Sequence, residues 1–434
     1  MALTPSIAVF RRQAYRRYWI MRQFVSASRQ MTAVAIGWQV YDYARETRSI
    51  EEAALLLGAV GLTQFAPVLA LSLIGGQAAD RYDRKTILTL GNCAKLIVLL
   101  ALGFAAGAET NTALIIIFAC AAALGGINAF IPAASNSLYP KLVPRSELPL
   151  AISWNSLGFQ TAAILGPALG GALYIGGPGL VYGVAAAMTV CAIISIAGAK
   201  TPAHEPIANA RGSAMILDGL RYMRSNRIVL GAISLDLVVV LFGGATALLP
   251  VFARDILGVG AEGLGILRAA PALGAVLVAA TLASRPLTNH VGRWLLGAIA
   301  VYGVATIGFG LSTAFWLSIV MLAITGAADM ISVYIRQSLI QLATPDGMRG
   351  RVSSVSFIFI SASNELGEFE SGVAARFLGP VGAVLLGGCV ALACAGLWPK
   401  LFPTLSNASR FEDTHLHQAP KAPLEASPIK STSL

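Results

Sequence analysis

The sequence predicts an all-α integral membrane protein in which twelve transmembrane helices form two pseudo-symmetric six-helix halves. Its 434 residues are 56% hydrophobic and 12% charged, whereas about a quarter of the residues in soluble proteins are charged. Many apolar runs are about 20 residues long, enough for a helix to cross the ~30 Å hydrocarbon layer. Because backbone polar groups must be satisfied within lipid, these spans should be helices. A sequence repeat, in which the second half of the chain resembles the first, divides them into two sets of six.

Twelve spans and five regions follow from the apolar runs and the polar segments between them. The spans are expected at 19–43, 53–77, 86–107, 112–138, 150–175, 179–198, 228–251, 262–284, 292–311, 315–342, 352–375 and 379–399. Lysine and arginine gather in alternate connections, so the positive-inside rule places both termini in the cytoplasm and the chain in the cell (cytoplasmic or inner) membrane. The regions are an N-terminal segment (1–18), a first half (19–198), a linker (199–227), a second half (228–399) and a tail (400–434).

The linker and the tail differ in composition from the spans. The linker starts with a Pro/Ala-rich stretch, and then Met215, Leu217, Leu220 and Met223 recur at helical spacing. This spacing predicts a short amphipathic helix on the cytoplasmic surface. The tail is polar and rich in Pro and Ser, which predicts disorder.

The repeat is visible in two pairs of segments. GLTQFAPVL (61–69) in the second span matches GILRAAPAL (265–273) in the eighth, and NSLYPKLVP (136–144) matches QSLIQLATP (337–345) at nearly the same offset. Duplicated halves usually place the substrate path at their interface, near the middle of the bilayer. We therefore expect the functional residues on the helices that border this interface.

Several classes of function are disfavoured by what the sequence contains. The five cysteines lie inside apolar runs without a Cys-x-x-Cys pair, and the four histidines lie in polar segments, so we expect no metal centre, no cofactor and no enzyme active site. The basic residues are dispersed over many loops rather than gathered in one patch, and we expect no nucleic-acid partner. The sequence has no G-x-x-x-x-G-K-[ST] phosphate loop, which argues against ATP as the energy source.

The connection after the second span, GGQAADRYDRK, contains Gly76, Asp80, Arg81, Arg84 and Lys85. It resembles the signature loop of the major facilitator superfamily, and the resemblance extends over nearly all of residues 10–400. It implies a gating latch that stabilises the outward-facing state, in which the glycine lets two helix ends approach, the aspartate accepts from the N-terminus of span eleven, and the basic residues complete a charge network. The alternative is that these charges only set the topology. The equivalent second-half connection, SRPLTNHVGR, lacks the aspartate, so the latch should be one-sided.

Span five contains AAILGPALGG, with Gly166, Pro167, Gly170 and Gly171. It resembles the glycine-proline motif in the fifth helix of exporters and drug:proton antiporters of the same superfamily. The resemblance favours export over import, and the small residues permit a bend and close packing against the other half. The alternative is ordinary packing of small residues. The strings VFARDILGVGAEGLGILRAAPALGA, GMRGRVSSVS and SNELGEFESG are similar to the branch that contains the enterobactin exporter and transmembrane secretion effectors.

Four carboxylates inside the spans are candidates for proton coupling: Glu365, Glu368, Asp329 and Asp236. An ionisable group within the membrane costs several kcal/mol unless a partner or water compensates it. Glu365 and Glu368 are three residues apart and share a helix face, while Glu370 points elsewhere. Glu365 is the preferred proton site, with Glu368 as its partner.

Two arginines inside the spans, Arg29 and Arg268, are candidates for an ion pair with these acids or for binding an anionic substrate. Lys95, in span three, has a stem long enough to reach the interface. The alternative for the whole set is that the charges form fixed ion pairs between helices.

Together these features predict a secondary active transporter that exports a small organic molecule by alternating access and proton antiport. A siderophore-like compound, a drug or a metabolite would suit it. Its partners would be the substrate, protons and the lipid bilayer, and it would act as a monomer. An importer or facilitator on the same fold, and a non-transporting membrane sensor, are the alternatives.

Overall fold

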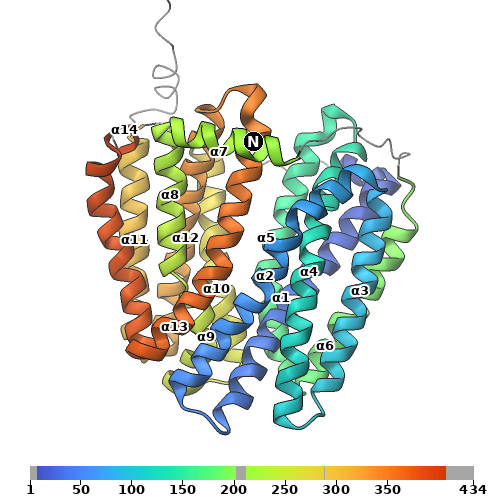
Figure 1. Cartoon of the computed structure of the whole chain (residues 1–434), viewed down its shortest axis with the longest axis vertical. Helices are drawn as coiled ribbons and strands as arrows, with labels where there is room; N and C mark the ends of the chain where they lie inside the picture. The colour runs from blue at the N-terminus through green and yellow to red at the C-terminus, as the bar shows by residue number, and fades with distance from the viewer. Residues whose placement is uncertain (1–6, 202–211, 288, 407–434) are drawn as a thin grey trace, which may run out of the picture.

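The computed structural model describes residues 7–201, 212–287 and 289–406, and helices make up almost all of this part of the chain (Figure 1). The first half begins with a short 3-10 turn, η1 (Ile7–Arg11). Its long helices are α1 (Gln13–Arg45), α2 (Ile50–Arg81), α3 (Arg84–Ala105), α4 (Thr110–Leu138), α5 (Leu148–Tyr174) and α6 (Pro178–Ala197), with the turns η2 (Tyr139–Lys141) and η3 (Arg145–Glu147) before α5.

The second half follows the linker helix α7 (Gly212–Ser225). Its elements are α8 (Arg227–Phe242), η4 (Ala245–Leu248), α9 (Leu249–Val251), the π-helical turn η5 (Phe252–Ile256), α10 (Ala261–Ser284), α11 (Val291–Leu311), α12 (Phe315–Leu342), α13 (Asp346–Leu401) and α14 (Pro403–Ser406). Although α13 is continuous by its hydrogen bonds, Gly379 has a positive φ of 73° and divides it into two helices. A residue with a side chain would be strained there.

Nine segments of the described chain are long and apolar enough to cross a membrane. Neither α1 nor α5 is among them, since α1 contains several arginines and α5 is rich in polar and small residues. When these two helices are added and α13 is divided at Gly379, twelve spanning helices result. The predicted all-helical, twelve-span fold is confirmed.

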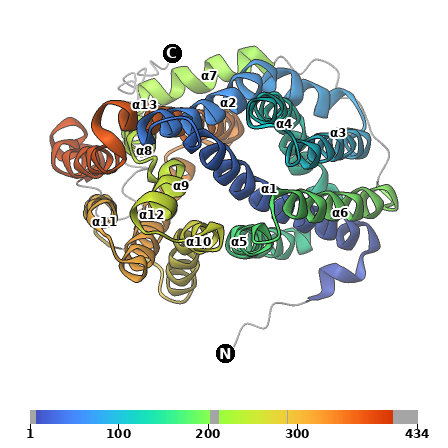
Figure 2. The same ribbon diagram turned by 90° about the horizontal axis from the view of Figure 1, so that it is seen from below.

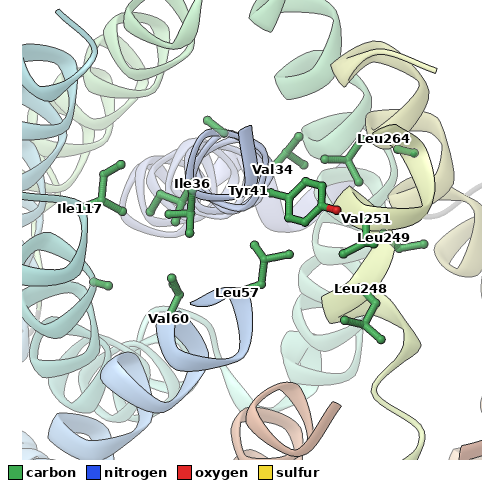
Figure 3. Packing of buried hydrophobic residues seen from close by; sticks show 14 of the residues in the cluster. Val34, Ile36, Tyr41, Leu57, Val60, Ile117, Leu248, Leu249, Val251 and Leu264 are labelled. Carbon is green, nitrogen blue, oxygen red and sulfur yellow. The ribbon is translucent and has the colours of Figure 1, made fainter. Parts of the chain in front are cut away.

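The hydrophobic core is shared by the two halves at only one end of the molecule. We call the end that holds α7 and the start of α1 the linker end, and the other the opposite end (Figure 1). One cluster, at the opposite end, combines residues of both halves, as Figure 3 shows for Tyr41 and Leu57 beside Leu249 and Leu264. The clusters toward the linker end are separate, one in each half. The halves are therefore packed together at the opposite end.

The repeat in the sequence corresponds to a repeat in the packing. A Cβ atom on Gly125 of α4 would collide with the carbonyl of Gln64 in α2, and one on Gly326 of α12 would collide with the carbonyl of Pro271 in α10. Glycine is needed at both places because the two backbones touch. The same close helix pair thus occurs once in each half.

Several boundaries differ from those predicted. Helix α1 starts six residues earlier than expected, because Tyr15 and Tyr18 are buried. The seventh span is interrupted after α8, where Gly243 and Gly244 follow each other, and the hydroxyl of Tyr302 donates to the carbonyl of Gly243 at 3.1 Å.

The linker and tail are only partly described. Met223 of α7 is buried and Leu220 is 43% exposed, so the predicted apolar face is not buried as a whole. The predicted tail is wrong for residues 400–406, because α13 continues to Leu401 and Leu405 of α14 is buried. The linker residues 202–211 and the tail beyond 406 lie outside the described residues.

Candidate functional site

Four of the predicted charges, from three helices, lie near one another. We call Glu365, Glu368, Arg268 and Arg29 the central charge group. The charges of Arg29 on α1 and Arg268 on α10 both act on the two glutamates of α13. Arg29 is exposed and the other three side chains are partly exposed, so the group is accessible although it lies inside the bundle. At 1.5 Å per residue, Glu365 is about 21 Å and Glu368 about 16 Å from the turn at Gly379.

Glu368 and Arg268 of the central charge group contact different neighbours. A Cβ atom on Gly61 of α2 would lie 3.0 Å from the Cβ of Glu368, so this side chain packs directly against the first half. Arg268 instead donates from Nη1 to the carbonyl of Ala33 in α1 at 3.4 Å. Within the described residues, no cation is within 4.0 Å of either glutamate carboxylate. The opposite charges face each other without forming a closed pair.

The other two predicted acids belong to a separate cluster within the second half. Asp236 of α8 forms an ion pair with Arg336 of α12, and both side chains are about nine-tenths buried. Asp329 is 3.9 Å from the same guanidinium, and its side chain is 52% exposed. Asp329 therefore does not join Glu365, with which we grouped it. We did not predict Arg336 as a site residue, although its position inside a predicted span was a signal that could have identified it.

Lys95 is buried in the first half. Its side chain is 5% exposed and its amine donates to the carbonyl of Val25 in α1 at 3.2 Å. The predicted extension of the lysine toward the membrane interface is therefore wrong, because the carbonyl of α1 offers a nearer acceptor.

The glycine-proline motif of α5 packs against two helices. A Cβ atom on Gly166 would lie 2.5 Å from the Cβ of Gln30, and one on Gly170 would lie 3.0 Å from the Cα of Met31, both in α1. Gly171 and Pro167 instead contact Gly265 of α10, in the other half. Figure 2 shows α5 beside α10 and α2 beside α13, the two close contacts between the halves.

Ion pairs join the halves at the opposite end. Asp42 pairs with Arg254 at 2.6 Å, Arg45 with Asp255 at 3.4 Å, and Glu52 with Arg376 at 3.1 Å. The hydroxyl of Tyr41 donates to Asp255 at 2.5 Å. Each partly exposed pair contributes little alone, but together with the shared core they close this end.

The predicted latch loop lies at the linker end, where α2 ends and α3 begins. A Cβ atom on Gly76 would meet nothing within 4 Å, while one on Gly75 would collide with the carbonyl of Ala129 in α4. The close helix approach expected at Gly76 therefore occurs at Gly75, whose position on α2 faces α4. Asp83, which we did not predict, caps α3 by accepting from the amide of Thr86 at 3.1 Å.

The charged residues of this loop have different environments. Arg84 is buried, and Lys85 donates to the carbonyl of Ala199 at the end of α6, at 2.9 Å. Lys85 thus connects helices of one half. Arg81 ends α2 and is exposed. Asp80 makes no hydrogen bond or ion pair with the residues that the structure describes.

We expect Asp80→Asn to disfavour the state in which the linker end closes, because the predicted latch would lose its carboxylate. A charge-assisted hydrogen bond contributes about 1.5–3 kcal/mol, so the population of that state should fall roughly tenfold or more. The fraction of time that the protein spends in this state, measured by single-molecule fluorescence between labels on the two halves, should fall, with ligand affinity nearly unchanged. Weaker binding with an unchanged population would contradict a latch.

Comparison with known families identifies the type of protein. A family model described as transmembrane secretion effector, of the major facilitator superfamily, matches residues 4–428. The chain belongs to this family. Curated relatives of this secretion effector include the enterobactin exporter EntS of Citrobacter koseri, 27% identical over 383 residues, and that of Escherichia coli, 26% identical over 386 residues. Both alignments cover 86% of each chain.

Solved structures show the same fold for this chain. A D-xylose–proton symporter matches with a TM-score of 0.68 at 13% identity, over 90% of this chain and 99% of that one. A bacterial homologue of the iron transporter ferroportin, in an inward-facing state, matches with a TM-score of 0.68 at 15% identity, over 91% and 98%. The protein is a multi-pass membrane transporter of the major facilitator type with similarity to exporters, and not an enzyme.

Proposed function

We propose that the protein exports a small organic molecule by alternating access, driven by proton antiport through Glu365 and Glu368. The observation that carries the proposal is the central charge group, in which two glutamates lie near two arginines without a closed ion pair. A carboxylate that is partly accessible, and that lies where the halves meet, can gain and lose a proton as the halves move. The glycine-proline contact between α5 and α10 supports export.

We also propose that this conformation is inward-facing. Lysine and arginine are concentrated in the connections at the linker end, so the positive-inside rule places this end and both termini in the cytoplasm. The ion pairs and the shared core then close the outer side. Asp80, which has no partner among the described residues, fits a latch that forms only when the protein faces outward.

The substrate class follows from the relatives. Because two of them are named enterobactin exporters, enterobactin is the first compound to test, followed by other siderophore-like compounds, drugs and metabolites. The protein should take up its substrate into inside-out vesicles when the lumen is acidified. Uptake that is indifferent to the proton gradient would contradict antiport.

An importer is the second candidate, and the arginines favour it under one condition. If an anionic substrate bound to Arg29 and Arg268, it would bind best when the glutamates are protonated and leave the arginines free. Proton and substrate would then bind together, as in symport. Substrate affinity that rises as the pH is lowered would support import. Substrate affinity that decreases as the pH is lowered would support antiport.

A further inference from the structure

Residues 366–372 of α13 occupy the position in the second half that the glycine-proline motif of α5 occupies in the first. The segment LGPALGG (165–171) aligns with LGEFESG (366–372), which preserves two glycines and replaces Pro167 by Glu368. The offset of 201 residues equals that between the matched segments that leave the fourth span of each half, NSLYPKLVP and QSLIQLATP. The two segments are therefore equivalent positions of the duplicated fold.

The contacts of the two segments are also equivalent. Gly166 packs against α1, the first helix of its half, and a Cβ atom on Gly367 would lie 2.8 Å from the carbonyl of Val240 in α8, the first helix of the other half. Gly171 touches α10, and a Cβ atom on Gly372 would lie 2.8 Å from the Cα of Gly58 in α2. The halves thus meet through two related contacts, α5 with α10 and α13 with α2.

The two contacts differ at one position. In the contact of α5 with α10, a Cβ atom on Gly265 would lie 2.6 Å from the carbonyl of Pro167. In the contact of α13 with α2, a Cβ atom on Gly61, the matching glycine of the repeat, would lie 3.0 Å from Oε2 of Glu368. At this position, therefore, the second contact has a carboxylate where the first has a backbone carbonyl. Glu368 is faced by Glu365 on its own helix, Arg268 on α10 and Arg29 on α1, while α2 presents Gly58 and Gly61.

We propose that Glu368 controls the outer gate, and that its protonation allows α13 to close on α2. The inference rests on the proposed proton antiport. When the contact closes, the carboxylate loses water against Gly61, which costs far more for the charged form than for the neutral one. Arg268 and Arg29 reduce this cost without removing it, because no ion pair within 4.0 Å joins either of them to the carboxylate in the described part of the chain. Protonation from outside would then return the empty transporter to the inward-facing state.

The test measures the outer gate without a substrate. Spin labels at Asn111→Cys and Thr313→Cys, both exposed and at the opposite end, are placed in full-length protein without its native cysteines and reconstituted in nanodiscs. Distances are measured at about pH 6 and about pH 8, on either side of neutrality. The closed population should grow at the lower pH. In Glu368→Gln the closed population should be large and should be the same at both pH values.

Three further variants make the result specific. Glu370→Gln, on the same helix, should keep the wild-type pH response. Gly265→Ala disturbs the contact of α5 with α10, and should change the closed population while its pH response remains. Glu368→Asp should retain a response. A wild-type gate that ignores pH, or a Glu368→Gln variant with the wild-type response, would overturn the proposal.

The outcome can be separated from that of the proposed function. Proton-driven export by a protein whose gate ignores pH would refute the gate role and leave antiport intact. A gate that responds to pH through Glu368, in a protein whose flux ignores the proton gradient, would support the gate role and refute antiport.

Discussion

Glu365→Gln should abolish proton-driven transport while leaving the protein folded. Glutamine keeps the size and hydrogen-bonding capacity of the side chain but cannot exchange a proton. Because Glu365 is nearer the middle of the bundle than Glu368 and is under the influence of Arg29 and Arg268, its loss should remove one of the two proton sites through which we propose that transport is driven. Uptake into inside-out vesicles with an acidified lumen should fall to the level of protein-free vesicles.

Two controls separate coupling from damage. The Tm of Glu365→Gln should match that of the wild type, and substrate exchange without a proton gradient should continue if the variant still moves between its two states. Glu370→Gln, on the same helix, should retain driven uptake. Wild-type flux with an unchanged pH dependence in Glu365→Gln would remove this residue from the mechanism.

The fold was predictable because its causes are local in the sequence. Apolar runs of the right length determine the spans, and the repeat assigns them to two halves. The matched glycines Gly61 and Gly265, found by sequence alone, are both at contacts between the halves. A duplicated fold places equivalent residues at equivalent interfaces, so this was a consequence of the repeat.

The site was only partly predictable, because contacts between distant segments depend on the rotation of each helix. Glu365 and Asp329 both lie inside spans, but α12 directs Asp329 toward Arg336 and away from the central charge group. The shift from Gly76 to Gly75 is likewise one residue, or about 100° around the helix. Hydropathy does not specify such an angle.

The ion pairs at the opposite end were missed for a different reason. Asp42 and Arg254 lie at span ends, where charges are common, and they are 212 residues apart in the chain. Nothing in either local sequence indicates the other. The pair forms because the conformation brings the two halves together at this end.

Arg336→Met should cause a large loss of stability. It leaves Asp236, whose side chain is about nine-tenths buried, without its cation, and breaking one partner of a buried ion pair costs about 3–5 kcal/mol. The Tm measured in detergent should fall clearly. The matched control is Arg376→Met, which removes the partner of Glu52 in a half-exposed pair and should change the Tm little.

The double variant Arg336→Met with Asp236→Leu tests whether the pair is structural. Replacing a buried pair by apolar residues is often neutral, so it should recover most of the lost Tm. It should also keep proton-driven uptake, because Asp236 then only joins α8 to α12 and the proton sites lie on α13. If the double variant recovers its stability but loses proton-driven uptake, Asp236 belongs to the proton path. If its Tm equals that of Arg336→Met, the loss of stability comes from packing and not from the unpaired charge.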